Sequence, residues 1–145
     1  MPDFNYARGR IRESVQFISM EIKEFDTDYA AKTWQEYQKD RKLQKLMDRT
    51  VENVLTALIE ICGTLTTEKG IGAESYGETI KNATQLLGFS LEDQEKMAKL
   101  AIQRNRLAHR YLNFRWQAIR MFSENKKLIV EMLERILVLE KEKEE

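Results

Sequence analysis

His109 is the only histidine in the chain, so acid–base chemistry near neutral pH depends on this one imidazole. It lies in the segment Arg104-Asn105-Arg106-Leu107-Ala108-His109-Arg110-Tyr111. On one continuous helix Asn105 and His109 share a face, so the amide could orient the imidazole. Arg104 and His109 are five positions apart and would point about 140° away from each other. They converge only if the helix breaks near His109 or if two copies of the segment meet in a symmetric dimer.

An imidazole and a guanidinium in one cleft are suited to phosphodiester cleavage without a metal ion. The neutral imidazole removes the proton from a ribose 2′-hydroxyl, and that oxygen attacks the adjacent phosphorus. The guanidinium binds the phosphate oxygens and stabilises the charge that develops in the transition state. In a dimer, the histidine of the second chain can protonate the leaving 5′-oxygen. Arg104 and His109 are therefore candidates for RNA cleavage.

Basic residues are concentrated in one stretch, although the whole chain is neutral with 24 basic and 24 acidic residues. Residues 96–123 contain no Asp or Glu, and their basic residues are Lys96, Lys99, Arg104, Arg106, Arg110, Arg115 and Arg120. Such a stretch favours an anionic partner, or else a solvated helix that pairs with acids of other helices. Tyr111, Phe114 and Trp116 add aromatic faces for stacking of RNA bases, although Phe114 and Trp116 suit the core better.

The sequence contains no motif of several other enzyme classes: it has no Walker loop, dinucleotide fingerprint or HExxH. The single cysteine, Cys62, lies in an apolar stripe and is expected to be a buried small hydrophobe, not half of a Cys–His dyad. We expect no cofactor and no metal. The longest apolar run is residues 136–139, far shorter than a membrane span or a signal peptide. A cytoplasmic protein without membrane contact is therefore expected.

Helical periodicity runs through almost the whole chain, which has only six glycines and one proline. The expected helices cover residues 7–25, 43–65, 76–87, 91–107 and 116–141, with a short helical segment at 29–37. Residues 26–28 favour a turn, residues 66–75 a loop, and Gly88 a helix end. Ser90 is the expected N-cap of the next helix. The pattern predicts an all-α, up-and-down bundle of four to five helices. It forms a single domain over residues 1–145, with a charged tail at about 140–145.

The segment around His109 resembles the signature of HepT-like proteins, which belong to the HEPN superfamily of small helical nucleases and nucleotide-associated domains. That signature is Arg, four residues, His, one residue and Tyr, and it matches Arg104 to Tyr111. Residues 48–61 resemble the family's long second helix, and Ser75-Tyr76-Gly77-Glu78 resembles the start of its third. The resemblance covers roughly residues 40–135. It departs at Arg115, where members often carry an acidic residue, and at Ile102-Gln103, where many carry Gly-Phe.

The resemblance implies a HEPN-like fold and a homodimeric, metal-independent endoribonuclease toxin of a type II toxin–antitoxin pair. It implies an MNT-type minimal nucleotidyltransferase antitoxin as the partner and RNA as the substrate. By the same resemblance Arg104 and His109 are catalytic, Asn105 supports the site, and Tyr111 is the tyrosine that the antitoxin adenylylates. AMP on Tyr111 would add bulk and negative charge beside Arg104. The candidates for RNA binding are Arg106, Arg110 and Arg115.

Two other functions are compatible with the same residues. The protein could be a non-catalytic nucleotide-binding or substrate-presenting partner of a nucleotidyltransferase, in which the motif binds a nucleotide phosphate. It could also be a purely structural dimeric bundle. That function predicts that acids of the fold neutralise the basic segment and that His109 is buried away from any cleft.

Overall fold

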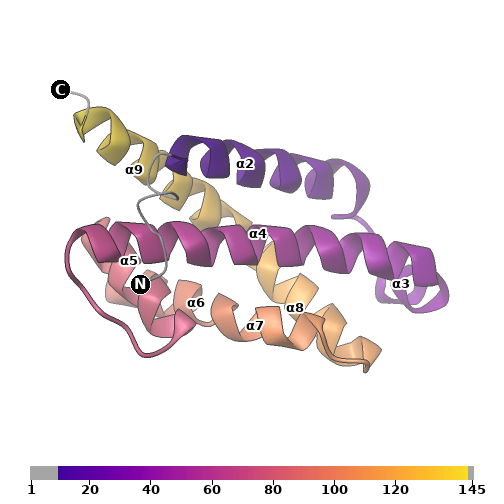
Figure 1. Ribbon diagram of the computed structural model, residues 1–145. Helices are drawn as coiled ribbons and strands as arrows, with labels where there is room; N and C mark the ends of the chain where they lie inside the picture. The colour runs from indigo at the N-terminus through magenta and orange to yellow at the C-terminus, as the bar shows by residue number, and fades with distance from the viewer. Residues whose placement is uncertain (1–9, 144–145) are drawn as a thin grey trace.

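The computed structural model describes residues 10–143, a range that holds helices and no strand. The helices are α2 (Ile11–Asp28), α3 (Trp34–Lys39), α4 (Arg41–Glu68), α5 (Tyr76–Leu86), α6 (Leu91–Ala98), α7 (Leu100–Leu107), α8 (Leu112–Glu124) and α9 (Lys126–Lys143). Successive long segments reverse direction along the bundle (Figure 1), which confirms the predicted all-α, up-and-down architecture. Residues 7–9 of the first expected helix and residues 144–145 of the expected tail lie outside the described range.

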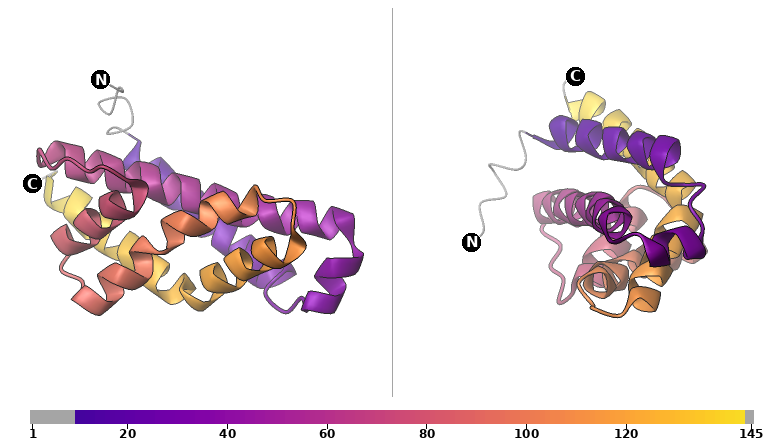
Figure 2. Two further views of the ribbon diagram at one scale, coloured as in Figure 1. Left: turned by 90° about the horizontal axis from the view of Figure 1, so that it is seen from below. Right: turned by 90° about the vertical axis from the view of Figure 1, so that its right-hand side faces the viewer.

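Helix α4 is the central element of the bundle and contacts α2, α3, α5, α7 and α8. Figure 2 shows it between α2 on one side and the α6–α7 segment on the other. Asp40 caps its first turn by accepting a hydrogen bond from the Leu43 N–H at 3.0 Å. Its buried stripe includes Cys62, which has no exposed surface, as expected. Burial raises the pKa of the Cys62 thiol, so this cysteine is a packing residue.

Aromatic rings hold the outer helices together around α4. Phe25 of α2 meets Phe122 of α8 edge to face, with ring centroids 5.0 Å apart. Trp116 of α8 packs against Trp34 and Tyr37 of α3, with centroids 6.0 and 5.1 Å away. Burying one such ring contributes about 1.5–3 kcal/mol to folding. These contacts place Trp116 against the core, the location that its sequence context favoured.

The first two helices differ from the expected boundaries. The predicted end of the first helix near Phe25 is wrong, because α2 continues to Asp28. Thr27 donates its hydroxyl to the Lys23 carbonyl at 2.9 Å, so its side chain bonds within the helix and does not cap it. The following helix begins only at Trp34, after Thr33 and Glu36 form a capping box.

Two long expected helices are interrupted in the structure. Lys99 separates α6 from α7, and Asn125 separates α8 from α9 with φ −108° and ψ 10°. The single helix predicted over residues 116–141 is therefore wrong, and its first part begins at Leu112. The Asn125 side chain donates to the Met121 carbonyl at 2.8 Å and satisfies an acceptor at the break. Phe122, before the break, and Ile129, after it, are both buried.

The helix ends around α5 are those that the sequence predicts. Ser75 caps α5 through the Glu78 N–H at 3.1 Å, and Ser90 caps α6 through the Asp93 N–H at 3.2 Å. Gly88, which follows α5, has a φ of +81°, a conformation that glycine adopts without strain. The Ser75 cap sets the residue at which α5 begins, and it therefore sets which residues of the first turn of α5 lie opposite α7.

The expected charged tail continues α9 as far as Lys143. Lys143 forms ion pairs with Glu68 at 2.6 Å and Glu140 at 2.7 Å, which join the end of α9 to the end of α4. Among residues 10–143, no helix is both long enough and apolar enough to span a bilayer.

Candidate active site

The helix that carries Arg104 ends before His109. Helix α7 stops at Leu107, and the next two N–H groups bond three residues back, with His109 donating to the Arg106 carbonyl at 3.1 Å. Leu107 is buried and Leu112 is half-buried against the core, and one continuous helix would point these residues about 140° apart. The turn therefore allows both to pack inward. The expectation that Asn105 and His109 share one face of a continuous helix is therefore wrong.

His109 stands at the surface in a cluster of three rings. Its ring centroid lies 4.8 Å from the rings of both Tyr111 and Phe114, nearly perpendicular to the latter. The Tyr111 backbone N–H donates to His109 Nδ1 at 3.3 Å, which leaves Nε2 for a ligand. His109 and Tyr111 are exposed. A purely structural bundle predicts that His109 is buried, and that prediction is wrong. Phe114 is half-buried beside these rings and is not among the residues that pack against the core, so the core position expected for it is wrong as well.

Arg104 is held against α4. Its Nε donates to Thr56 Oγ1 at 2.8 Å, and its Cζ lies 6.0 Å from the centroid of the Tyr76 ring. Within residues 10–143 the guanidinium forms no ion pair, although Glu60 lines the same cavity of about 220 Å³. Since the hydrogen bond uses Nε, the two terminal nitrogens remain available for a bidentate contact with phosphate.

One chain does not bring Arg104 and His109 together. Arg104 lies against Thr56 and Tyr76, whereas His109 packs against Tyr111 and Phe114 beyond the end of α7. No hydrogen bond in the described part of the chain joins the two side chains. The helix break that the sequence allowed is present, but it does not by itself complete a site containing both groups.

The other arginines of the basic segment differ in their surroundings. Arg106 and Arg110 are exposed, and the Arg110 Cζ lies 5.5 Å from the centroid of the Tyr111 ring. Arg115 instead forms a 2.7 Å ion pair with Asp48, and its side chain is only 19% exposed. The structure thus presents Arg106 and Arg110 to solvent and uses Arg115 inside the fold.

Asp48 is the buried acid that receives Arg115. It also accepts a 2.7 Å hydrogen bond from the Tyr37 hydroxyl. Burial raises the pKa of the Asp48 carboxyl, and the hydrogen bond from Tyr37 and the charge of Arg115 oppose that rise. Burial and the bond to the carboxylate likewise raise the pKa of Tyr37.

Sequence reasoning did not identify Thr56 and Tyr76 as members of the site. Thr56 is separated from Arg104 by 48 residues, and threonine in a helix carries no signal of its own. Tyr76 directly follows the Ser75 cap, and the sequence does not show that its ring stays 57% exposed. Among the described residues, no group of three or more His, Cys, Asp or Glu side chains could hold a metal ion.

Comparison with known families gives one match across most of the chain. A family model described as ribonuclease HepT-like matches residues 13–138. The matched range contains α3 to α8 entirely, most of α2 and α9, and the whole segment from Arg104 to Tyr111. No curated protein matches the chain.

Proposed function

This chain belongs to the HepT-like ribonuclease family, and from that membership we propose that it is a metal-independent endoribonuclease toxin of a type II HEPN/MNT toxin–antitoxin system. The observation that carries the proposal is that two groups suited to this chemistry are available near the end of α7. Arg104 is a cation without an ion pair among the described residues, and His109 is an exposed imidazole just beyond the helix. Both occupy the motif positions at which the family resemblance implies catalysis.

A second copy of the chain completes the site in this proposal. Since Arg104 and His109 do not touch within one chain, a symmetric dimer would place two of each around one cleft. One His109 takes the proton of the ribose 2′-hydroxyl as that oxygen bonds to phosphorus. The bond from phosphorus to the 5′-oxygen breaks, and the partner's His109, in its protonated form, gives that oxygen a proton. The products are a 2′,3′-cyclic phosphate and a 5′-hydroxyl.

The contact between Tyr111 and His109 bears on the proton transfer. A neutral ring that accepts the Tyr111 N–H at Nδ1 carries its own hydrogen on Nε2. To act as a base through Nε2, the ring must carry that hydrogen on Nδ1 and give up the contact. At 3.3 Å the contact is longer than most hydrogen bonds. We therefore assign it a role in orienting the ring before RNA binds.

Tyr111 is the proposed site at which an MNT-type antitoxin silences the protein. Its ring is 51% exposed and its neighbours are His109 and Arg110. On one continuous helix Arg104 and Tyr111, seven positions apart, would share a face, and AMP on Tyr111 would lie beside Arg104. The helix instead ends at Leu107. An AMP group on Tyr111 would instead place its phosphate and adenosine next to His109, where they would obstruct approach of RNA to the imidazole.

An RNA cleavage assay in EDTA tests the proposal. The unmodified protein, shown by mass spectrometry to carry no AMP, is expected to cut single-stranded RNA and leave 2′,3′-cyclic phosphate ends. Protein adenylylated on Tyr111 is expected to lose that activity. If clean, unmodified dimer leaves several RNA types intact, the nuclease proposal fails. The alternative, a nucleotide-binding partner of a nucleotidyltransferase, would then be tested by titration with AMP.

Thr56 is expected to position Arg104 for this reaction. Replacing Thr56 with Val removes the acceptor of the 2.8 Å hydrogen bond from Arg104 Nε. Hydrogen bonds to charged groups contribute about 1.5–3 kcal/mol, so kcat/KM for RNA should fall by roughly 10- to 150-fold. Thr56→Ser retains the hydroxyl and should recover most of the activity. Equal activity of the Val and Ser variants in steady-state assays would contradict a positioning role.

A further inference from the structure

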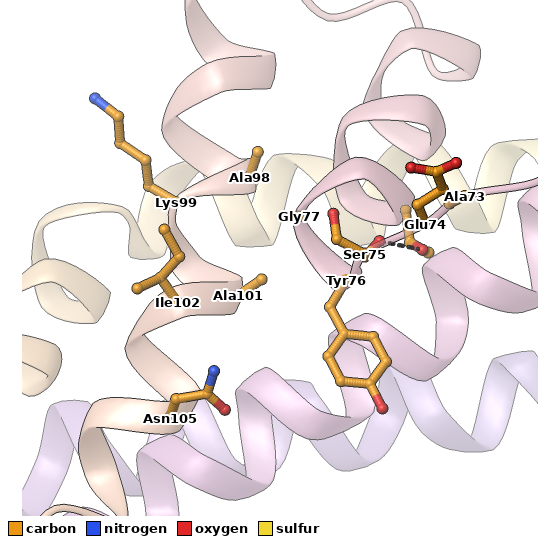
Figure 3. A pocket seen from close by; sticks show the side chains of 11 residues that line it. Ala73, Glu74, Ser75, Tyr76, Gly77, Ala98, Lys99, Ala101, Ile102 and Asn105 are labelled. Atoms are coloured by element: carbon orange, nitrogen blue, oxygen red, sulfur yellow. Dashed lines mark hydrogen bonds between the residues drawn. The ribbon is translucent and has the colours of Figure 1, made fainter.

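A cavity of about 760 Å³ opens between the first turn of α5 and the junction of α6 with α7. Figure 3 shows its two walls, with Ser75, Tyr76 and Gly77 on the α5 side and Ala98 to Asn105 on the other. Its volume lies within the range of pockets that bind small organic groups. Its lining mixes small apolar residues with polar and charged ones, so it is suited to a flat group that has apolar faces and polar edges.

Tyr76 connects this cavity to the proposed active site. Its ring is 57% exposed and lines both the 760 Å³ cavity and the smaller cavity that contains Arg104. The Arg104 Cζ lies 6.0 Å from the ring centroid. A nucleotide whose phosphate is bound by Arg104 therefore has its base within reach of the Tyr76 ring. Unpaired RNA bases stack on exposed aromatic rings of this kind.

Asn105 supplies a polar group on the opposite wall. Figure 3 shows its amide on α7, across the opening from Tyr76. Asn105 is exposed, and its amide offers both a donor and an acceptor for the edge of a base. Glu74 and Lys99 also line the cavity, so its two charged side chains offset each other, whereas Arg104 in the adjoining cavity forms no ion pair in the described range. The phosphate therefore belongs at Arg104, and the base belongs in the cavity.

We propose that this cavity is a subsite for one unpaired nucleobase of single-stranded RNA, stacked on Tyr76 with its edge towards Asn105. The proposal rests on the proposed function, because Arg104 must bind the phosphate of the same nucleotide or its neighbour. In this proposal Tyr76 contributes affinity for any base by stacking, and Asn105 distinguishes between bases by hydrogen bonding to their edges. It also explains why a large aromatic ring remains exposed beside a cation that has no ion pair in the described range.

Binding of RNA to a protein that cannot cleave it tests this subsite. In a His109→Ala background, fluorescein-labelled 12-nucleotide homopolymers are titrated and their Kd is measured by anisotropy. Stacking of one base contributes about 1–3 kcal/mol, so Tyr76→Ala should raise the Kd roughly 5- to 150-fold for all four homopolymers. Tyr76→Phe keeps the ring and should bind like its parent. Asn105→Ala should change the ranking of the homopolymers and so provides a second, independent readout.

An abasic RNA of the same length provides the matched control. The His109→Ala parent should bind this abasic RNA more weakly than the homopolymers. Adding Tyr76→Ala should not weaken that binding further, because no base remains to stack. Arg104→Ala should weaken both RNAs equally, because it removes a phosphate contact. The subsite is rejected if the parent binds no RNA at low salt, if Tyr76→Ala binds the homopolymers as tightly as its parent, or if its loss is the same on abasic RNA.

The cleavage assay of the His109-containing protein separates this result from that of the proposed function. Cleavage by wild type together with binding that does not depend on Tyr76 rejects the subsite and retains the nuclease. Binding that depends on Tyr76 without cleavage by wild type retains the subsite and rejects the nuclease.

Discussion

Replacing His109 with Ala is expected to lower kcat for RNA cleavage by about 100- to 10,000-fold, the usual contribution of a general acid or base. In the proposed dimer both imidazoles are lost at once, so the effect should lie towards the larger value. His109 is exposed, and within residues 10–143 its ring contacts are those with Tyr111 and Phe114, so the variant should fold. The KM for RNA should change little, because the imidazole acts mainly in the transition state.

The measurement is single-turnover cleavage of a labelled RNA in EDTA, with Arg110→Ala as the matched control. Arg110 lies next to His109 and is exposed, and its loss should weaken RNA binding without removing the chemical step. Imidazole added to the buffer should restore part of the activity of His109→Ala and leave Arg110→Ala unchanged. Equal residual cleavage by wild type and His109→Ala would show that the activity comes from a contaminant and not from this imidazole.

Replacing Arg115 with Leu is expected to lower the free energy of unfolding by about 3–5 kcal/mol, the cost of breaking a buried ion pair from one side. Asp48 would then remain in the core with only the Tyr37 hydroxyl as a partner. Such a loss is a large fraction of the roughly 5–15 kcal/mol that stabilises a typical domain. Urea unfolding followed by circular dichroism measures it, and Arg110→Leu, at an exposed site, should change stability by about 0.5 kcal/mol or less.

The pH dependence of this loss has a defined sign. Burial raises the pKa of Asp48, and removal of Arg115 takes away a charge that opposes the rise. The folded variant therefore binds a proton on Asp48 more readily than the unfolded chain does. The difference in free energy of unfolding between wild type and Arg115→Leu should therefore become smaller as the pH falls from 7 towards 4. The double variant Asp48→Asn with Arg115→Leu should show no such narrowing, and a deficit in Arg115→Leu that stays constant with pH would contradict the assignment.

Local patterns in the sequence predicted most helices because the chemistry of helix ends is local. Ser75, Ser90 and Gly88 act within four residues of where they stand, and the structure uses all three as caps. The interruptions at Lys99 and Asn125 were missed, because the apolar period continues through them. Phe122 and Ile129 are seven positions apart and would share a face on a continuous helix as well, so their burial gives no sign of the break at Asn125.

The sequence by itself determined the types of group available for chemistry. It placed one histidine after an arginine in a basic stretch that contains no acid, and these residues match the motif of the family to which the chain belongs. Helical periodicity was likewise sufficient for the all-α class, because each helix needs only neighbours within a few positions to form its backbone bonds.

Only the tertiary structure decided which of these charges is available to a ligand. Arg104 and Arg115 look alike in the sequence, yet one meets Thr56, 48 positions away, and the other meets Asp48, 67 positions away. The neutral Thr56 hydroxyl forms no ion pair, and Arg104 has none in the described range, whereas the buried carboxylate of Asp48 pairs with Arg115. The cavity beside Tyr76 likewise exists only where α5 meets α7. Contacts between such distant residues depend on how helices pack, and packing is set by the whole core and not by local spacing.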